Sequence, residues 1–220
     1  MTQTKLVAIV PAYNESATIG SVVRILKQSP YLSEVFVISD GSVDRTAQVA
    51  REAGARVHEI PRQGGKGEAL LHALTHTDAP VVAFFDADLR GLTVEHVEQL
   101  VLPVLNGSRV MNVGLRDRGL LMTALTRHLP LIAGERALRR NVVENVPAEY
   151  LRGFMVEAAL NYYCRAHGFA YGAVKLKGLS MRRKYEKVGY ARAVLQYGQM
   201  FYQVASAMVI VRIAHLRGKF

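Results

Sequence analysis

The sequence contains a single cysteine, Cys164, among its 220 residues. One thiol cannot form an internal disulfide, so the fold must be held together by its core. The apolar residues around Cys164 indicate a buried core thiol rather than a nucleophile. Half of the residues are hydrophobic, which is enough for one sizeable core in one domain. A chain without disulfides suits a reducing compartment, and we expect a cytoplasmic protein.

Long uninterrupted apolar runs are also missing. The first run, Leu6 to Val10, has five residues and leads into Pro11, so we expect no N-terminal targeting segment. The most apolar stretch of the second half, residues 204–216, has 13 residues and includes Arg212. A membrane span needs about 20 apolar residues, so we predict no membrane-spanning helix.

Acidic residues are scarce in the second half of the chain. Residues 1–110 contain 10 Lys and Arg against 12 Asp and Glu, whereas residues 111–220 contain 18 against 6. This surplus of basic over acidic residues in the second half predicts an anionic partner, namely phosphate, nucleic acid or an acidic membrane surface. The alternative is a solvated basic face with no specific partner.

Two common phosphate-binding signatures are absent. The segment after the first apolar run reads "PAYNES", which lacks the G-x-G-x-x-G pattern of dinucleotide-binding domains. Lys66 is followed by Gly67 rather than by Ser or Thr, so "GGKG" is not a P-loop. Both of these nucleotide-binding classes therefore fit the sequence less well.

What the first half does contain is a regular alternation of short apolar strands and helices. The pattern predicts strands at 6–10, 35–39, 56–60, 81–85 and 110–114, and helices at 17–28, 45–53, 67–75 and 94–105. This alternation is typical of βαβ units, so we expect an α/β fold with a mostly parallel central sheet flanked by helices. Asp44 and Thr93 are the expected N-caps of the second and fourth helices.

The second half is less regular. We predict helices at 119–128, 147–152 and 154–167, a strand at 172–178, and a long helix from about 188 to 216. The change in charge near residue 115 indicates two functional halves of one domain, residues 1–115 and 116–220, with a helical C-terminal extension.

Polar clusters follow the first four predicted strands. They read "PAYNE" (11–15), "SDGSVDRT" (39–46), "PRQGGKG" (61–67) and "DADLRG" (86–91). The carboxyl ends of parallel strands lie along one edge of a sheet, which is where ligands bind in α/β proteins. We therefore predict that the four clusters build one site.

Each cluster has a chemical role that suits a nucleotide. Tyr13 can lie against a flat base, Glu15 can accept from a ribose hydroxyl, and Asp40 can accept from a base N–H. The basic glycine loop that contains Lys66 suits a diphosphate. The structural alternatives are that Asn14 caps the first helix, that "DGS" is only a turn, and that "GGKG" is an ordinary glycine loop.

Asp86 and Asp88 stand one residue apart, directly after a buried strand. Two neighbouring carboxylates are costly unless a cation lies beside them. A divalent ion would offset the repulsion and also bind diphosphate oxygens, and oxygen ligands favour Mg²⁺ or Mn²⁺. The alternative is a pair of solvated loop acids.

The segments "VPAYNE", "ISDGSVDRT", "GGKGEAL" and "FFDADL", in this order and spacing, resemble family 2 glycosyltransferases, which have the GT-A (Rossmann-like) fold. The resemblance is specific over residues 5–115. It continues more weakly through "AGERALRR" (133–140) and "GFMVEAALN" (153–161), and is strongest to dolichol-phosphate mannose synthase-like and glucosyl-3-phosphoglycerate synthase-like members.

The resemblance implies a metal-dependent transfer of a hexose from a UDP- or GDP-sugar to an anionic acceptor, such as a phosphorylated small molecule or polyprenyl phosphate. The implied donor-binding residues are Pro11, Tyr13, Glu15, Asp40, Lys66 and Asp86. Asp86 and Asp88 would hold Mg²⁺ or Mn²⁺, Asp88 and Glu157 would be catalytic, and Gly134 and Arg136 would bind the acceptor.

Glu157 lies among apolar residues of a predicted helix, so we expect it to be partly buried. It either takes a proton from an acceptor hydroxyl or only positions a sugar hydroxyl. Alternatively it pairs with an arginine such as Arg136 or Arg152. The histidine metal ligand of some relatives has no counterpart in residues 178–184. Paired acids are absent around Glu157, so retention and inversion at the anomeric carbon both stay open.

Two alternatives stay open for the C-terminal helix. It packs on the domain or on a second copy as a homodimer, or it lies at the inner face of a membrane with Arg182, Arg183, Lys184 and Lys187 facing anionic lipid.

Two other function classes rank lower. A sugar-phosphate nucleotidyltransferase would have a glycine-rich loop after the first strand, and "PAYNE" has no glycine. A non-enzymatic nucleic-acid binder would stack bases on Tyr162, Tyr163, Tyr185 and Tyr190. Their helical spacing favours the core instead, so no nucleic acid is expected.

Overall fold

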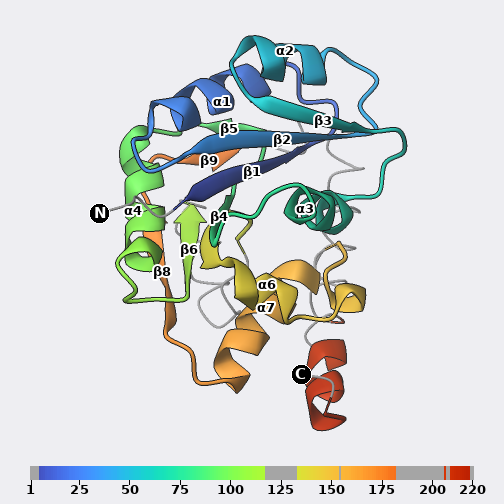
Figure 1. The fold of residues 1–220 in the computed structure, drawn as a ribbon, viewed down its shortest axis with the longest axis vertical. Helices are drawn as coiled ribbons and strands as arrows, with labels where there is room; N and C mark the ends of the chain where they lie inside the picture. The colour runs from blue at the N-terminus through green and yellow to red at the C-terminus, as the bar shows by residue number, and fades with distance from the viewer. Residues whose placement is uncertain (1–4, 117–132, 154, 182–205, 207–208, 219–220) are drawn as a thin grey trace.

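The computed structural model describes residues 5–116, 133–153, 155–181, 206 and 209–218. A sheet in the order β3-β2-β1-β4-β7-β6-β8 crosses the molecule (Figure 1). Its strands are β1 (Leu6–Ala12), β2 (Glu34–Asp40), β3 (Arg56–Ile60), β4 (Val81–Phe84), β6 (Met111–Arg116), β7 (Arg136–Arg139) and β8 (Tyr171–Leu176). A second, two-stranded sheet pairs β5 (Leu89–Arg90) with β9 (Ser180–Met181). In the large sheet only β7 runs antiparallel to its neighbours, so the predicted mostly parallel sheet is confirmed.

Helices cover both faces of the large sheet. They are α1 (Ile19–Gln28), α2 (Thr46–Glu52), α3 (Lys66–Leu74), α4 (Val94–Leu105), α6 (Arg140–Glu144), α7 (Met155–Ala166) and the 3₁₀ turn η1 (Ala148–Tyr150). Figure 1 shows α1 and α2 above the strands and α3, α6 and α7 below them.

The alternation of side chains along β1 explains why both faces are covered. Val7 and Ile9 pack into the cluster that contains the buried residues of α3 and α7. Leu6, Ala8 and Val10 pack into the opposite cluster with α1 and α4. Because successive strand residues point to opposite faces, a fully apolar strand requires an apolar layer on each side.

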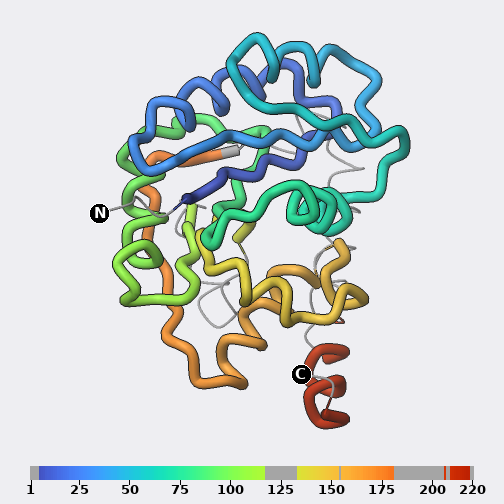
Figure 2. The backbone as a smooth tube through the Cα atoms, viewed as in Figure 1, coloured from blue at the N-terminus to red at the C-terminus, as the bar shows by residue number. Residues whose placement is uncertain are grey.

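The sheet joins both halves of the sequence. β8 pairs with β6 in parallel, and β7 lies between β4 and β6. Figure 2 shows the orange segment of β8 beside the green segment of β6. The basic second half therefore supplies strands to the same sheet that carries the four polar clusters, rather than a sheet of its own.

Local signals placed most first-half elements correctly. Thr93 caps α4 as expected, because its side chain accepts from His96 N at 3.2 Å and the His96 ring reaches back to Thr93 N at 3.3 Å. Asp44 Oδ1 accepts from Thr46 N at 2.9 Å, although the residue at the N-cap position of α2 is Arg45. Both side chains satisfy N–H groups that a helix leaves unpaired at its start.

The first strand was predicted to end at residue 10, before Pro11. In the structure β1 continues through Pro11 to Ala12. Phe85 N donates to Ile9 O at 3.1 Å, so Ile9 bonds toward the β4 side. Residues two apart in a parallel strand bond toward the same side, so Pro11 faces the side where β4 has already ended at Phe84. No ladder hydrogen bond is lost there, which is why a proline is tolerated.

In the second half the predictions were less complete. Strand β7 and helix α6 were not predicted, and residues 147–152 form a short 3₁₀ turn instead of a longer helix. Helix α7 and strand β8 agree with the predictions for 154–167 and 172–178 to within a few residues. The predicted helix at 119–128 lies outside the described residues, as does most of the one at 188–216.

The described part of the C-terminal helix, residues 209–216, packs on the domain. Val211 and Ala214 are buried in the cluster formed by α3 and α7, and the His215 ring lies 5.2 Å from the Tyr162 ring. Ile213 and Leu216 are exposed. Within the described residues, no helix combines the length and the apolar character that crossing a bilayer requires.

Cys164 is a buried core thiol, as the sequence indicated. Its side chain is fully buried on α7, and burial raises the pKa of the thiol to about 11. Thiolate is the reactive form of cysteine, so the folded chain holds this thiol in its inert state.

We therefore expect Cys164 to react with Ellman's reagent at pH 8 at least about 100-fold more slowly in the folded chain than in urea. The rate would be followed by absorbance, with Cys164→Ala as the blank for reagent decay. A folded-state rate close to the rate in urea would show that the thiol is accessible and would contradict this packing.

Candidate functional site

The four polar clusters that follow β1, β2, β3 and β4 are linked one to the next. Between the first two clusters, Asn14 Oδ1 accepts from Val43 N at 2.9 Å and Glu15 N donates to Thr46 Oγ1 at 2.8 Å. These bonds fasten the loop after β1 to the loop after β2. The sequence prediction that the clusters share one edge is therefore confirmed for this pair.

Asn14 does not cap the first helix, which was one of the structural alternatives. Helix α1 begins at Ile19, and its N-cap residue is Thr18. Asn14 instead has φ of 52°, a left-handed conformation that asparagine tolerates better than most residues. The turn leaves the neighbouring Tyr13 with 43% of its surface exposed, so its ring is accessible to a flat ligand.

Asp40 links the second cluster to the third. Its carboxylate is buried at the end of β2 and accepts from Gly64 N at 2.9 Å and from Gly65 N at 2.7 Å. Gly65 has φ of +88°, which explains the glycine at this position. Asp40 thus holds the glycine loop in place, and "DGS" is more than a turn.

Lys66 links the third cluster to the fourth. It is the first residue of α3, and its Nζ donates to Asp86 Oδ1 at 2.7 Å. Arg116, at the end of β6, lies on the other side, with its Nη1 3.5 Å from Asp86 Oδ2. Burial acts to raise the pKa of Asp86, but the charges of Lys66 and Arg116 outweigh it and hold the pKa well below its usual range.

Gly134 makes the contact between Lys66 and Asp86 possible. A Cβ at this position would lie 2.4 Å from Lys66 Nζ and 2.7 Å from both carboxylate oxygens of Asp86. These distances are far shorter than any van der Waals contact between such atoms. The predicted acceptor residue Gly134 therefore lies at the centre of the site, where any side chain would collide with the ion pair.

Glu135 and Arg116 belong to the site, although the sequence analysis did not identify them. Glu135 is fully buried, and its Oε2 lies 3.4 Å from Arg116 Nε. Burial, followed by the charge of Asp86, raises the pKa of Glu135 to about 7. The only sequence signals were a carboxylate inside "AGERALRR" and an arginine directly after a predicted strand.

Glu157 approaches the same lysine from α7. Its side chain is buried, and its Oε1 lies 3.5 Å from Lys66 Nζ. Among the described residues, its Oε2 has no hydrogen-bond partner. A buried carboxylate oxygen without a donor is uncommon and indicates a group that is still to be bound.

Arg136 does not reach the surface, although it was predicted to bind the acceptor. It is 1% exposed, and its Nη2 donates to Ala133 O at 2.7 Å. Burial lowers the pKa of Arg136, and the charge of Glu157 opposes this effect. Within the described residues the ion pair of Glu157 is with Lys66, at 3.5 Å, and not with Arg136 as the alternative from the sequence had it. Of the two arginines that end the segment "AGERALRR", Arg140 donates to Leu74 O at 2.8 Å and to Glu144 at 2.6 Å, while Arg139 is exposed.

The residues after β4 fit a divalent cation. Asp86 and Asp88 offer carboxylate oxygens, Asp88 is buried, and the depressed pKa of Asp86 keeps that group ionised near neutral pH. Oxygen ligands of this kind suit Mg²⁺ or Mn²⁺. The unpartnered oxygen of Glu157 adds negative charge to the same cluster.

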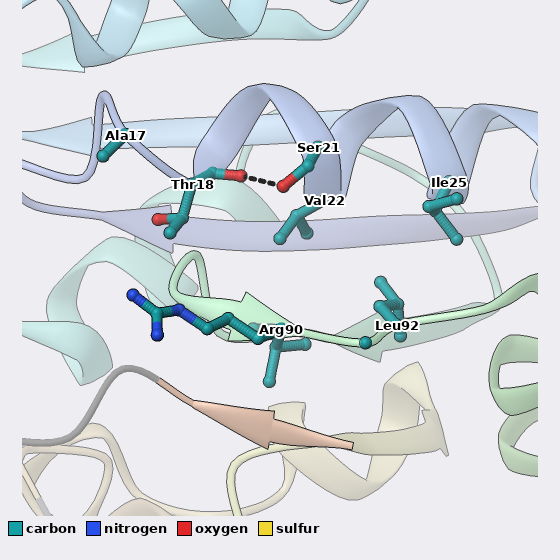
Figure 3. A pocket seen from close by; sticks show the side chains of 9 residues that line it. Ala17, Thr18, Ser21, Val22, Ile25, Arg90 and Leu92 are labelled. Carbon is teal, nitrogen blue, oxygen red and sulfur yellow. Dashed lines mark hydrogen bonds between the residues drawn. The ribbon is translucent and has the colours of Figure 1, made fainter. Parts of the chain in front are cut away.

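A pocket of about 460 Å³ lies beside this cluster rather than on it (Figure 3). Helix α1 contributes Val22 and Ile25, and the β5 segment contributes Arg90 and Leu92. Figure 3 shows these side chains facing each other across the opening. None of the predicted site residues lines it.

Comparison with protein families gives one assignment. The family model described as glycosyl transferase family 2 matches residues 7–166. Glucosyl-3-phosphoglycerate synthase from Mycolicibacterium smegmatis is 38% identical over 106 residues, covering 44% of this chain and 35% of that protein. The synthase of the same name from Petrotoga mobilis is 29% identical over 187 residues, covering 68% and 57%. The chain thus spans between about a third and three-fifths of these relatives.

Solved structures agree with this assignment. Glucosyl-3-phosphoglycerate synthase from Mycobacterium tuberculosis, in complex with Mn²⁺, UDP-glucose and phosphoglyceric acid, superposes with a TM-score of 0.79 at 28% identity. The match covers 94% of this chain and 79% of that one. A structure of the same enzyme with Mg²⁺ and UDP gives a TM-score of 0.74 at 26% identity.

The close approach at Gly134 leads to a stability prediction. We expect Gly134→Ala to push Lys66 off Asp86 and to lower the free energy of unfolding by about 1–3 kcal/mol. The matched control is Gly172→Ala, whose Cβ would lie 2.7 Å from Arg109 Cζ, away from the ion pair of Lys66 and Asp86. Urea titration followed by circular dichroism measures both, and equal losses in the two variants would contradict the central position of Gly134.

Proposed function

The chain belongs to glycosyl transferase family 2, and from this premise we propose that it transfers a hexose from a nucleoside-diphosphate sugar to a phosphorylated acceptor. The observation that supports this most is the meeting of Lys66, Asp86 and Glu157 at one point, with room left by Gly134. The relatives' structures contain UDP-glucose and phosphoglyceric acid, so we propose these two compounds as the first donor and acceptor to test.

The nucleoside is proposed to lie over the loops after β1 and β2. Tyr13 is exposed there for contact with the base, and Pro11 and Glu15 border the same loop. Asp40 already accepts two backbone N–H groups, but each of its oxygens has a second lone pair for a base N–H. Its other contribution is to fix the glycine loop that leads to Lys66.

The diphosphate is proposed to lie at the start of α3. Lys66 supplies a positive charge there, and the unpaired N–H groups of the helix N-terminus add a further attraction for phosphate. Without a donor, the Asp86 carboxylate is the ion-pair partner of the Lys66 ammonium group. A diphosphate oxygen would therefore replace the carboxylate as a partner of the lysine.

Asp86 and Asp88 are the residues that would hold Mg²⁺ or Mn²⁺. Bound there, the ion would neutralise the charge that develops on the departing nucleoside diphosphate. Asp88 is buried, so its position is fixed by the surrounding chain, which favours a precise ligand over a flexible one.

Glu157 is proposed to face the acceptor. Its Oε1 is near Lys66, and its buried Oε2 is free to accept a hydroxyl proton. An acceptor hydroxyl that donates to Oε2 would satisfy this oxygen and would be oriented for attack. Gly134 leaves the space in which Lys66 and Asp86 meet, and the buried Arg136 adds a nearby positive charge.

The alternatives have less support. Tyr163 is buried and Tyr162 is half-buried on α7, so these rings are not a surface for stacked bases; Tyr185 and Tyr190 lie outside the described residues. The loop after β1 has no glycine for a nucleotidyl-transfer site.

We expect Asp88→Asn to lower the rate of transfer from UDP-glucose to phosphoglycerate, with Mn²⁺ present, by about 100- to 1,000-fold, because the metal that would neutralise the departing diphosphate would lose one of its carboxylate ligands. The control is Asp78→Asn, an exposed carboxylate that pairs with Lys5 and should leave the rate unchanged. Release of UDP and formation of product are measured by chromatography.

Calorimetry with UDP-glucose, GDP-mannose and Mn²⁺ tests donor binding separately. If no sugar nucleotide binds with or without metal, the proposed function is wrong. Release of pyrophosphate from a nucleoside triphosphate and a sugar phosphate would favour the nucleotidyltransferase instead. Transfer to polyprenyl phosphate but not to phosphoglycerate would show that the proposed acceptor is wrong, while the proposed hexose transfer would stand.

For the C-terminal helix we infer an association role. Val209, Ile213 and Leu216 recur at helical spacing and are all exposed, Leu216 by 77%, and Arg212 and Arg217 lie beside them. An apolar stripe of this kind suits a second copy of the chain or, with its basic neighbours, the inner face of an anionic membrane. Both occupants remain predictions.

We expect the double variant Ile213→Glu with Leu216→Glu to abolish this association, because it places two charges in the apolar stripe. Light scattering measures the mass in solution, and co-sedimentation with phosphatidylserine vesicles at low salt measures membrane binding. A wild-type chain that is monomeric and does not sediment would show both predictions to be wrong.

A further inference from the structure

Three histidines gather at the sheet edge formed by β3, away from the carboxylate cluster. His58 lies on β3, the terminal strand of the large sheet. His72 is in the last turn of α3, and His76 follows two residues after the helix ends. His72 is six residues along the chain from Lys66, or about 9 Å along the helix axis, so the group is distinct from the proposed donor site.

The fold explains why the three rings meet. His58 is paired in register with Ile38 of β2, whose side chain belongs to the core layer covered by α3, so His58 points toward that helix. His72 and His76 are four residues apart, a spacing that puts two side chains on the same side of a helical segment. The strand and the helix end thus present their imidazoles to one another.

The ring nitrogens have the separation that a shared metal ion requires. His72 Nε2 lies 3.1 Å from His58 Nδ1, and one ligand atom from each of the three residues lies within 4.8 Å of the others. The three ring centroids are 4.5, 4.6 and 4.5 Å apart. Zn–N bonds of 2.0–2.1 Å in a tetrahedron put two nitrogens about 3.3 Å apart, so only small side-chain rotations would be needed.

The hydrogen bonds around His76 leave a lone pair available. Its Nδ1 lies 2.9 Å from the carbonyl oxygen of His72 and 2.9 Å from Thr75 Oγ1, which itself donates to that carbonyl. In the tautomer that donates to the carbonyl, Nδ1 carries the proton. The other ring nitrogen, Nε2, is then unprotonated in the neutral ring. Orientation of a ligating histidine by a backbone carbonyl is the usual outer-shell arrangement of metal sites.

The surroundings of His72 also favour its neutral form. Burial, followed by the charges of His58 and His76, lowers the pKa of His72, while Glu68 acts in the opposite direction. Arg56 faces the group from β3, but it donates to the carbonyl of His76 at 3.1 Å and lies 3.6 Å from Glu34. Neutral imidazole is the form that binds metals.

We propose that His58, His72 and His76 form a binding site for one borderline-soft divalent ion, of which Zn²⁺ is the representative. Three imidazoles select Zn²⁺, Co²⁺, Ni²⁺ or Cu²⁺ over Mg²⁺ and Mn²⁺, which prefer oxygen. With three protein ligands, a fourth position stays open for water or an external ligand. The ion would also fasten the end of α3 to β3, so the helix that starts with Lys66 would be held at both ends.

The test uses the untagged full chain after removal of metal. Titration with Co²⁺ should produce visible d–d bands that saturate at one equivalent, and added Zn²⁺ should displace the Co²⁺ and remove the bands. Competition between the protein and a chromophoric chelator then measures the affinity for Zn²⁺. We expect His58→Gln, His72→Gln and His76→Gln each to weaken Zn²⁺ binding by at least about 100-fold, since even the loss of an outer-shell partner weakens metal sites by 10- to 100-fold. Urea midpoints without metal show whether each variant is folded.

The matched control is His167→Gln, because His167 lies outside the cluster, with its Nδ1 3.0 Å from Tyr163 O, and should leave the binding unchanged. Absence of Co²⁺ bands, or Zn²⁺ binding that survives all three substitutions, would overturn the proposal. Asp88→Asn should retain the zinc site, so failure of this site and failure of the proposed transferase site are separate results.

Discussion

The ion pair between Lys66 and Asp86 is the contact on which the rest of the candidate site depends. It joins the start of α3 to the end of β4 at 2.7 Å, and three other groups are arranged around it. Glu157 approaches the lysine, Arg116 approaches the aspartate, and Gly134 leaves the space that the pair occupies. A single point therefore links elements from both halves of the chain.

The charge balance at this point differs from the one that the sequence predicted. The reasoning from sequence was that Asp86 and Asp88 tolerate each other only because a bound metal lies beside them. The structure shows that Lys66 and Arg116 already compensate Asp86, and that Glu135 holds a proton more readily than a free carboxylate. Asp86 is thus compensated without a metal, although the oxygens of both aspartates remain suited to one.

Much of the fold could be predicted from the sequence because its signals are local. Apolar runs of strand length, the Thr93 cap and the glycine turns are each decided by a few neighbouring residues, and the structure confirms them. The convergence of the four clusters followed from the parallel sheet. The family resemblance, confirmed by the match over residues 7–166, rested on the same clusters.

Strand β7 and the buried charges could not be predicted in this way. "RALR" is short and carries two arginines, so neither its length nor its composition indicates a strand. It is a strand because β4 and β6 pair with it on both sides, a long-range effect. The same pairing buries Arg136, which the sequence analysis assigned to acceptor binding, and places Glu135 beside Asp86.

The two ends of α3 illustrate how one helix can serve two kinds of chemistry. Its first residue, Lys66, faces carboxylates that suit hard cations, and its last turn carries His72 toward imidazoles that suit softer ones. On the proposed function Lys66 would change partners, because a diphosphate would offer it the negative charge that Asp86 supplies in this structure. When the lysine turns to the diphosphate, the Asp86 carboxylate loses its nearest counter-charge and becomes a better ligand for a cation. On electrostatic grounds, donor and metal should therefore bind more tightly together than either does alone.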